Sequence, residues 1–521
     1  MPAALGVLGR LETARNRLAE AGRSPARGRW FWAIAALVTG IAAVLRLVRL
    51  GSPTDLVFDE TYYAKDAWSL LTLGYEGVWA DDATTNPAFV AGDTSDLDSI
   101  GDFVVHPPLG KWLIALGMAV TGPGDPAGWR LAVALCGVLL VPVTMLIARR
   151  LTGSLGVAAV AGLLLAIDGL GIAMSRVALL DGPLALAVAV GVLCWLVDHD
   201  RHRRWALRQR SRHRLVGDVR TADRPHLVHW RRPWLLLAGI ALGAATAIKW
   251  SGLWYLAAFG LATVVADHVL RRRAGLPRPA VAAWLAQAPV SFLVLVPIAA
   301  ITHLASWLGW FVSSDGWGRQ AVEASGGWFE AATASLQSWW QYQAAVLGFH
   351  SSLSTDHPYA SPAWEWPLLL RPTLMWFERD EAAGIDTIIT PLPNPLLWWL
   401  AWAALAWLGW RAVRRRTIPG TGVLLLAIAA GWLLWLVMPE RTMYQFYTVV
   451  LLPYLVVALA LLLREIAGRD RSHAARRLSG IGTVAAVLAV IMLLSAWWYP
   501  MWTGLPVPTW FYGTHRWLPG W

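Results

Sequence analysis

The sequence predicts an all-α protein that crosses a membrane many times. Of its 521 residues, 57% are hydrophobic and 15% are charged, whereas a soluble domain carries roughly 25% charged residues. The mean hydropathy is +0.48. The 35 tryptophans fit the same class, because Trp favours the two interfaces between membrane and water. This composition excludes a soluble enzyme, a disordered protein and a coiled coil.

Eleven apolar runs account for the predicted spans, since a helix needs about 17–25 mostly apolar residues to cross a bilayer. The runs without Asp, Glu, Lys or Arg lie at about 30–45, 131–148, 151–167, 182–197, 233–248, 250–266, 279–303, 394–410, 417–439, 442–463 and 478–498. The first is not a cleaved signal peptide, because its basic leader is long and no small-residue cleavage site follows it. We therefore expect about eleven transmembrane helices.

The basic residues set the predicted orientation. With the N-terminus in the cytoplasm, the inner segments hold 32 of the 44 Lys and Arg residues, as the positive-inside rule requires. Eleven crossings then put the C-terminus outside. The predicted organisation is a cytoplasmic segment (1–29), a transmembrane domain (30–498) and an extracytoplasmic tail (499–521) of a multi-pass cell-membrane protein.

Two long outer loops are expected, at 51–129 and 304–393. The first contains two amphipathic stretches, Thr61–Leu73 and Leu109–Val120, which predict helices lying on the membrane surface. The acidic stretch 81–102 predicts a solvated loop. The second loop is dense in Trp, and this favours anchoring at the interface over stacking on a sugar or a peptide.

One inner loop, 198–232, is strongly basic. Two interpretations stay open for it: an electrostatic anchor to anionic lipid, or a docking surface for a partner such as the secretion channel. The net charge of +11 comes from such loops, so it does not indicate a nucleic-acid partner.

Charged residues gather at the outer ends of the predicted spans. A charge near membrane depth costs about 2.5–3.5 kcal/mol, and less near the interface, so these residues are functional candidates. They are Asp59, Glu60, His106, Arg130, Asp168, Arg176, Asp181, Lys249, Glu440 and Arg441. Because they belong to the ends of at least six spans, we expect one external cleft to gather them.

The cations among them predict a site for an anionic lipid headgroup. They are Arg130, Arg176, Lys249 and Arg441, joined by Lys111 from the second surface stretch. Arg side chains match the geometry of a phosphate. The alternative is that each cation only snorkels to ordinary headgroups, which is less fitting for four cations on otherwise cation-poor segments.

The pair Asp59–Glu60 predicts a catalytic carboxylate, which can act as a general base toward a hydroxyl. The alternative is that Asp59 caps the helix that begins near Thr61. His106 precedes two prolines that open the second surface helix, so it either binds a phosphate or sugar hydroxyl or caps that helix. No residue spacing requires a metal or another cofactor, and no phosphate loop or nucleophile elbow is present.

Short motifs surround these candidates, in a fixed order along the chain. They are Val57-Phe58-Asp59-Glu60-Thr61-Tyr62-Tyr63, His106-Pro107-Pro108-Leu109-Gly110-Lys111, Trp129-Arg130-Leu131, Asp168-Gly169, Ser175-Arg176-Val177-Ala178-Leu179-Leu180-Asp181, Ile248-Lys249-Trp250-Ser251-Gly252-Leu253 and Pro439-Glu440-Arg441. Together they resemble the protein O-mannosyltransferases, membrane-embedded glycosyltransferases of the GT-C type. The short second loop is similar to that of the actinobacterial branch.

The resemblance implies transfer of mannose from a polyprenyl-phosphate-mannose donor to Ser or Thr hydroxyls of secreted proteins, at an extracytoplasmic site. It implies that Asp59 is the base, that Glu60 is its acidic neighbour and that Arg130 contacts the donor phosphate. Binding of the donor is carried over, with less support, to Arg176, Asp181, Lys249 and Arg441. A phosphate leaving group needs cations rather than an acid, so one carboxylate suffices, and in-line attack inverts the sugar carbon.

Two other functions stay open from the residues alone. A related lipid-phosphate sugar transferase, acting on a lipid or a cell-wall glycan, would share the fold and the cations. A transporter of a lipid-linked sugar fits less well, because transporters favour internal repeats and sites at the middle of the membrane. The sequence has no visible repeat, and its unusual charges lie on one side.

Overall fold

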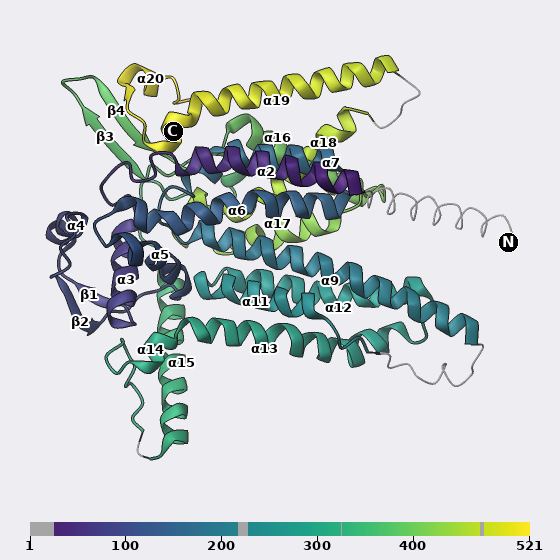
Figure 1. Ribbon diagram of the computed structural model, residues 1–521, viewed down its shortest axis with the longest axis horizontal. Helices are drawn as coiled ribbons and strands as arrows, with labels where there is room; N and C mark the ends of the chain where they lie inside the picture. The colour runs from purple at the N-terminus through teal and green to yellow at the C-terminus, as the bar shows by residue number, and fades with distance from the viewer. Residues whose placement is uncertain (1–24, 217–227, 325, 469–473) are drawn as a thin grey trace.

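The long helices of this protein run side by side along one direction (Figure 1). The computed structural model describes residues 25–216, 228–324, 326–468 and 474–521. The short helices, both small sheets and the C-terminus lie together at one end of the bundle, on the left in Figure 1. We call this the cap end. Most of the predicted N-terminal segment 1–29 lies outside the described residues.

Seven helices in the described residues are long and apolar enough to cross a membrane. They are α2 (Pro25–Leu47), α6 (Pro126–Thr152), α9 (Asp181–Val216), α12 (Gly252–Ala274), α13 (Ala288–Ser306) with the preceding π-helix η1 (Val281–Gln287), α16 (Pro395–Val413) and α19 (Ala474–Thr503). Four shorter helices are α7 (Leu155–Ile167), α11 (Pro233–Ile248), α17 (Thr421–Leu436) and α18 (Leu452–Ile466), the last preceded by the 3-10 helix η3 (Gln445–Val450). All eleven predicted runs are thus helical, and the predicted all-α membrane class is confirmed.

Burial distinguishes the inner helices of the bundle from the outer ones. In α18, Leu452, Leu455 and Leu459 are fully buried, as are the side chains on its other faces. A helix that is apolar all round belongs in the interior of a bundle. In contrast, α13 and α19 expose large apolar side chains such as Phe292 and Leu493, as helices that face lipid do.

Both predicted surface helices are present at the cap end, as α3 (Glu60–Leu73) and α5 (Leu109–Thr121). The expectation of a plain loop over 81–102 is wrong. This stretch contains α4 (Asp82–Val90) and β2 (Leu97–Gly101), which pairs antiparallel with β1 (Gly77–Trp79). Asp81 caps α4 by accepting a hydrogen bond from the backbone N–H of Ala83, so the acidic residues here start a helix.

The second long loop is also more ordered than its composition indicates. It contains α14 (Leu308–Val312), the 25-residue α15 (Trp328–Ser352) and the 3-10 helix η2 (Trp366–Leu368). A second antiparallel sheet has the order β3 (Trp376–Asp380), β4 (Ile385–Ile389) and β5 (Val507–Pro508). The last strand and α20 (Thr509–Gly513) come from the predicted tail, so the chain end closes onto the second loop. The one-turn helix α8 (Gly169–Ala173) follows α7.

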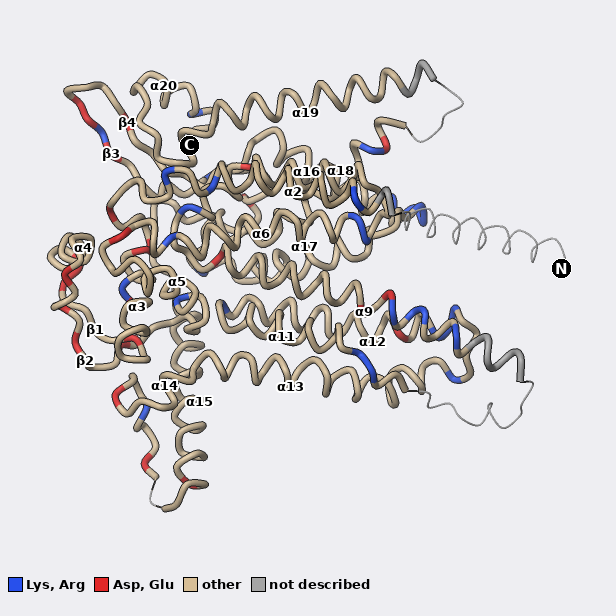
Figure 2. The backbone as a smooth tube through the Cα atoms, viewed as in Figure 1, with Lys and Arg blue, Asp and Glu red and all other residues tan. Residues whose placement is uncertain are grey.

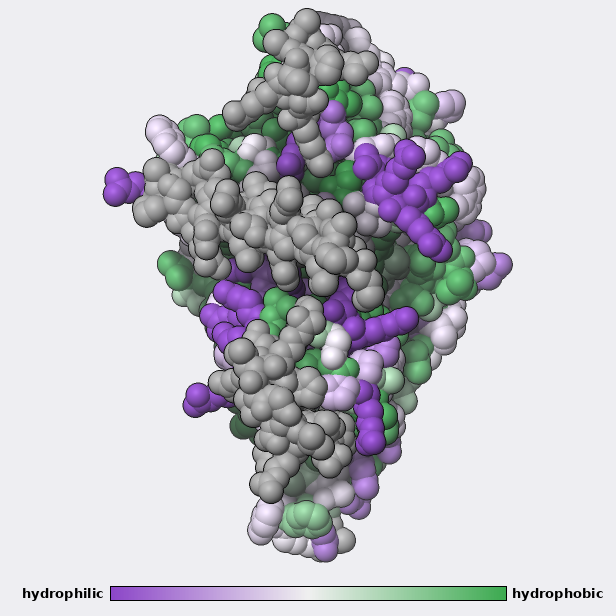
Figure 3. Space-filling view, turned by 90° about the vertical axis from the view of Figure 1, so that its right-hand side faces the viewer, coloured by the Kyte–Doolittle hydropathy of each residue, from purple (hydrophilic) through white to green (hydrophobic). Residues whose placement is uncertain are grey.

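Basic residues mark the other end of the bundle. Figure 2 shows Lys and Arg gathered where α6, α9, α12 and α18 end, away from the cap end. Figure 3 looks onto this face and shows hydrophilic side chains among hydrophobic ones. The basic stretch 198–232 is a loop only in part, because α9 continues as far as Val216. We call this the arginine end.

Candidate functional site

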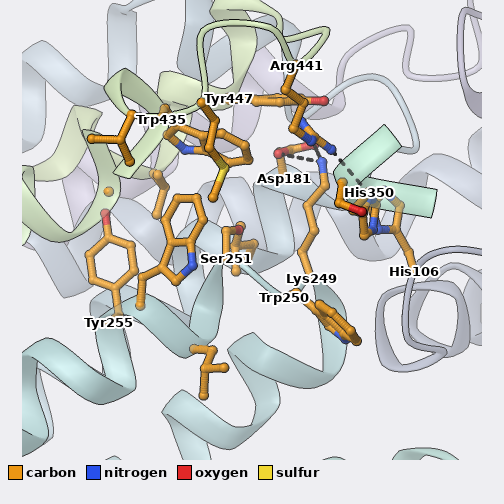
Figure 4. Close-up of a pocket in the computed structure, with 18 of the residues that line it drawn as sticks. His106, Asp181, Lys249, Trp250, Ser251, Tyr255, His350, Trp435, Arg441 and Tyr447 are labelled. Atoms are coloured by element: carbon orange, nitrogen blue, oxygen red, sulfur yellow. Dashed lines mark hydrogen bonds and ion pairs between the residues drawn. The ribbon is translucent and has the colours of Figure 1, made fainter. Parts of the chain in front are cut away.

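A cavity of about 710 Å³ lies at the cap end, bounded by α9, α12, α15 and α17. Its walls divide into two kinds. The charged and histidine side chains that line it are His106, Asp181, Lys249, His350, Glu440 and Arg441. The other part is apolar and aromatic and includes Leu253, Trp254, Tyr255, Trp435 and Tyr447. Figure 4 shows the charged groups on one side of the cavity and Tyr255 on the other.

Lys249 is fixed in the cavity by an ion pair. It is the residue where α11 ends, and its Nζ lies 3.0 and 2.9 Å from the two carboxylate oxygens of Asp181. Asp181 is the first residue of α9, where a carboxylate is favoured by the helix dipole. The ammonium also lies 4.6 Å from the ring centroid of Tyr447. An ammonium has three N–H groups, so one stays available for an anion in the cavity.

Arg441 supplies the second cation. Its guanidinium lies 5.2 Å from the ring centroid of Trp435, and Nη1 donates to the backbone oxygen of Thr442 at 3.2 Å. Its Nη2 lies 3.3 Å from Nδ1 of His350. These bonds to described residues use two of five N–H groups, which leaves Arg441 able to bind a phosphate.

His350 is a neutral acceptor for Arg441. Its Nε2 lies 3.1 Å from the carbonyl oxygen of Val105, and only a protonated nitrogen can bond there, so Nδ1 is left to accept. Burial and, to a smaller extent, the charge of Arg441 lower the pKa of His350 to about 4. The geometry and the pKa thus agree on an uncharged ring at neutral pH.

His106 lies against His350, with ring centroids 5.5 Å apart in a stacked arrangement. Burial, together with the charge of Lys249, holds the pKa of His106 well below its usual range. Its Nδ1 is buried and has no hydrogen-bond partner among the described residues. It does not cap α5, whose N-cap is Pro108. His106 is therefore a neutral ring with an unused nitrogen in the cavity wall.

Asp59 lies beside the cavity and not in its lining. It occupies the N-cap position of α3, but its side chain makes no capping hydrogen bond, so the capping interpretation is wrong. Burial raises the pKa of the Asp59 carboxyl to about 6, while the charge of Lys249 lowers it and that of Asp181 raises it. These influences place the carboxylate within electrostatic reach of the ion pair in the cavity.

The turn that presents Asp59 is held in an unusual conformation. Phe58 has φ of 52°, a left-handed backbone that costs a non-glycine residue about 1–3 kcal/mol. Its ring packs edge-on against Tyr444 and Phe446, with centroids 6.0 and 5.8 Å away. Tyr444 precedes η3 and Phe446 belongs to it, and η3 also supplies Tyr447 to the cavity. The ring of Phe58 thus joins the turn to the cavity wall.

Glu60 has no free acceptor position that could take a proton from a substrate. Its side chain is fully buried, and it accepts hydrogen bonds from Arg130 Nε and Nη2 at 2.8 and 2.7 Å. It also accepts from the backbone N–H groups of Val57 and Ala178, at 2.8 and 2.7 Å. A carboxylate has about four acceptor positions, and all four are occupied.

Arg130 is saturated in the same way. Besides the two bonds to Glu60, Nη1 donates to the carbonyl oxygens of Leu50 and Pro53 at 3.3 and 2.7 Å, and Nη2 donates to that of Asp55 at 2.9 Å. All five N–H groups are used, and the side chain is fully buried outside the cavity lining. In this arrangement Arg130 has no free N–H group to bind the phosphate of the mannose donor, the role that the resemblance implies for it.

Arg176 also binds backbone and lies outside the cavity lining. It donates to the carbonyl oxygens of Arg46, Val48 and Arg49 at 2.8–2.9 Å. These carbonyls belong to the last turn of α2 and to the two residues after it, where helical partners are missing. Arg176 therefore caps the C-terminal end of α2.

Lys111 and Asp168 are the remaining candidates that the structure keeps out of the cavity. Lys111 is fully buried, with Nζ 2.5 Å from Glu76 Oε1 and 3.5 Å from Asp66 Oδ2. Asp168 is the N-cap of α8 and accepts from the backbone N–H of Asn394 at 3.0 Å. Both residues join neighbouring elements of the cap end.

The structure therefore brings together only part of the predicted cleft. Asp181, Lys249, Glu440, Arg441 and His106 meet in the cavity, with Asp59 beside it. Neither His350 nor the aromatic wall was among the candidates predicted from the sequence. A lone His in an apolar, Trp-rich stretch was the only signal for His350. Within the described residues, no group of three or more His, Cys, Asp or Glu side chains is placed to hold a metal ion.

Two family models match the chain and together span most of it. Residues 95–306 match the dolichyl-phosphate-mannose-protein mannosyltransferase family. Residues 335–521 match the C-terminal four-transmembrane region of protein-O-mannosyltransferase. The first match holds Arg130, Asp181 and Lys249, and the second holds His350 and Arg441.

Relatives match over nearly their full length. The chain is 35% identical over 514 residues to the polyprenol-phosphate-mannose–protein mannosyltransferase of Mycolicibacterium smegmatis, covering 94% of this chain and 93% of that protein. It is 32% identical over 504 residues to the protein of the same name from Corynebacterium glutamicum, covering 94% and 92%. A chain of the Saccharomyces cerevisiae Pmt1–Pmt2 complex bound to the sugar donor superimposes with a TM-score of 0.72 at 14% identity, over 97% of this chain and 94% of that one. This likeness shows a shared GT-C fold.

The pair of Glu60 and Arg130, whose hydrogen-bonding groups are all used, predicts how a substitution there changes stability. We expect Arg130→Met to lower the free energy of unfolding by about 3–5 kcal/mol, because it leaves the Glu60 carboxylate buried without its partner. The measurement is the thermal unfolding midpoint of the detergent-solubilised protein. Arg150→Met is the matched control, since its pair with Asp200 is exposed and such pairs contribute about 0–1 kcal/mol. An unchanged midpoint with weaker donor binding would instead support a phosphate role for Arg130.

Proposed function

Because this chain belongs to the protein O-mannosyltransferase family, we propose that Asp59 is the catalytic base of a mannose transfer at the outer face of the membrane. The chain is a mannosyltransferase of the polyprenol-phosphate-mannose–protein class. The observation that carries the proposal is a partly exposed carboxylate with a raised pKa beside a cavity that holds two cations. The acceptor groups are Ser and Thr hydroxyls of secreted proteins.

The two walls of the cavity suit the two parts of the donor. Lys249 and Arg441 retain N–H groups for the phosphate, and guanidinium and ammonium groups both bind phosphate oxygens. Leu253, Trp254 and Trp435 give the prenyl chain an apolar surface. Glu440 is exposed at the same wall, where a carboxylate can accept from sugar hydroxyls.

The reaction needs one base and no acid. The acceptor oxygen attacks the sugar C1, the bond from C1 to the phosphate oxygen breaks, and its electron pair stays on the phosphate. Asp59 takes the hydroxyl proton as the new bond forms. Lys249 and Arg441 stabilise the charge that develops on the leaving phosphate. Attack opposite to the leaving group inverts the configuration at C1.

Glu60, Arg130 and Arg176 are positioning residues in this proposal. Glu60 is adjacent to Asp59, but its four acceptor positions are filled and it is fully buried. Arg130 holds the loop that precedes the base, and Arg176 holds the end of α2. His106, with its unused Nδ1, is placed to bind the donor or the incoming hydroxyl.

The charge distribution supports an outer position of the site. The arginine end carries most of the Lys and Arg residues (Figure 2), and the positive-inside rule puts such an end in the cytoplasm. The cap end then faces outward, where a secretion channel would deliver unfolded acceptors. We propose such a channel as a partner through the basic stretch 198–232, of which 217–227 lie outside the described residues.

The role of Asp59 as the base is tested by replacing its carboxylate with an uncharged amide. Asp59→Asn should lower turnover by about 10²–10⁴-fold, the usual contribution of a general base, with an unchanged unfolding midpoint and unchanged donor binding. The assay is transfer of radiolabelled mannose from polyprenyl-phosphate-mannose to a Ser/Thr-rich peptide. Asp55→Asn, at an exposed residue of the same loop, is the control and should stay active. Retention of normal turnover by Asp59→Asn would remove Asp59 from this role.

The raised pKa of Asp59 predicts a pH profile. A base must be deprotonated to act, so kcat/KM should be level above pH 6 and fall about tenfold per pH unit below it. Asp66 titrates in the same range, because burial raises its pKa to about 7. Asp66→Asn should leave the inflection in place. If the inflection disappeared in Asp66→Asn, the pH profile would report the titration of Asp66 and not that of Asp59.

The phosphate-binding role of Arg441 predicts a loss of donor affinity. A hydrogen bond to a charged group contributes about 1.5–3 kcal/mol, so Arg441→Met should lower kcat/KM for the donor by about tenfold to a hundredfold. Arg441→Lys should recover part of it. Arg371→Met, at a half-exposed arginine paired with Glu365, is the control.

We propose that these cations act without a metal ion. The transfer rate of the unsubstituted protein should therefore be unchanged by EDTA. A rate that falls with EDTA and returns with Mg²⁺ or Mn²⁺ would overturn this part of the proposal.

A further inference from the structure

We propose that α15 lies in the membrane interface at the cap end, with one apolar stripe in contact with lipid. Figure 1 shows α15 running across the ends of the spanning helices and continuing past α13. Spanning helices lie along the bundle direction, so a helix at a steep angle to them, at their end, lies near the plane of the membrane surface. Its N-terminal half has no spanning helix of this chain beside it in that view.

The exposed side chains of α15 are sorted by type. Six large apolar side chains are exposed, namely Trp328 (83%), Phe329 (69%), Leu336 (51%), Trp340 (69%), Leu347 (59%) and Phe349 (40%). Trp328 and Phe349 lie near the two ends of the helix and on other sides of it, which leaves Phe329, Leu336, Trp340 and Leu347. At 3.6 residues per turn these four positions fall within roughly 40° of one another around the helix. A single apolar stripe therefore runs along most of its length, and the described residues leave it uncovered.

The other two faces of α15 are different. One is buried and packs on the protein, through Ala334, Ser338, Tyr342 and Val346. The next is exposed and polar, through Glu330, Gln337 and Gln341. A helix with one face on protein, one polar face and one apolar face has the pattern of an interfacial helix.

The apolar stripe continues a surface that already faces lipid. The spanning helix α13 exposes Phe292, Leu293 and Ile301 at 55–61%, and the short α14 after it exposes Leu308 and Val312 at 63% and 79%. α15 follows these elements along the chain. The stripe of α15 is thus preceded along the chain by exposed apolar residues of a spanning helix.

The charge of α15 favours lipid contact through apolar area. Glu330 is its only charged residue, and it has no Lys or Arg. Attraction to anionic headgroups therefore contributes nothing to its position, and burial of the stripe must provide the free energy. An uncovered apolar patch of this length in water would be a strong exception.

This position ties the membrane surface to the active site. The C-terminal end of α15 supplies Leu347, His350 and Ser351 to the cavity. Leu347 belongs to both the stripe and the lining, so the lipid-facing stripe runs into the cavity. His350 accepts from Arg441. Lipid contact along α15 thus sets where this arginine lies.

The test is a measurement of depth at single sites, in the full chain reconstituted in lipid nanodiscs. The two natural cysteines are replaced by Cys136→Ser and Cys194→Ala, and a spin label is attached after Leu336→Cys or Trp340→Cys. Gln337→Cys and Gln341→Cys, one residue away on the polar face, are the matched controls. Power saturation then compares collisions with oxygen, which partitions into lipid, and with a water-soluble nickel chelate.

We expect labels at 336 and 340 to collide more with oxygen and those at 337 and 341 more with nickel. Equal preference for nickel at all four sites would place α15 in water and overturn the proposal. Protection from both reagents at 336 and 340 would mean that another protein or a second copy covers the stripe, and would overturn it as well. These measurements do not depend on transfer activity, so their outcome is independent of whether Asp59 is the catalytic base.

A second measurement tests the link to the cavity. Trp340→Glu should lower mannose transfer from the lipid donor several-fold, while Gln341→Glu, which adds the same charge on the polar face, should leave transfer unchanged. The unfolding midpoint of both variants serves as the folding control. Equal effects of the two substitutions would contradict the coupling between lipid contact and the cavity.

Discussion

The pair formed by Glu60 and Arg130 is the interaction on which the geometry of the site depends. Removing two charges from water costs several kcal/mol each, and only a complete set of partners offsets that cost. Here the five N–H groups of Arg130 and the four acceptor positions of Glu60 are all used. Because these bonds tie the loop after α2 to α6 and to the segment before α9, the strained turn at Phe58 is held and Asp59 has one position.

Access to the cavity separates the charged residues of the cap end into two groups. Arg130, Arg176 and Lys111 are all engaged with partners of the chain itself, mostly carbonyls and carboxylates. Lys249 and Arg441 keep N–H groups free and face the cavity. The first group builds the site, and the second is available to a substrate. Both groups consist of Lys and Arg, so residue type does not distinguish them.

The cavity is amphiphilic because it forms where spanning helices meet the cap end. Its apolar wall comes from helices that lie among lipid, and its cations come from the ends of α11 and the segment after α17. A lipid-linked sugar has the same division, with an apolar chain and a charged phosphate. α15 completes the boundary, since it contributes to the cavity and exposes an apolar stripe outside it.

The sequence by itself determined the membrane class, the eleven helical runs, the two surface helices at α3 and α5, and the motifs of the family. Each of these rests on composition or spacing along a short stretch, which the chain order alone records. It placed Asp181, Lys249, Arg441 and Asp59 among the candidates, but it could not separate them from Arg130, Arg176 and Lys111. Only the tertiary structure decided this, because carbonyl groups of Leu50, Pro53 and Asp55 occupy Arg130, and backbone groups carry no signal in a sequence. His350 entered the site for the same reason: its partners Val105 and Arg441 are distant along the chain and meet only when α15 crosses the ends of the bundle.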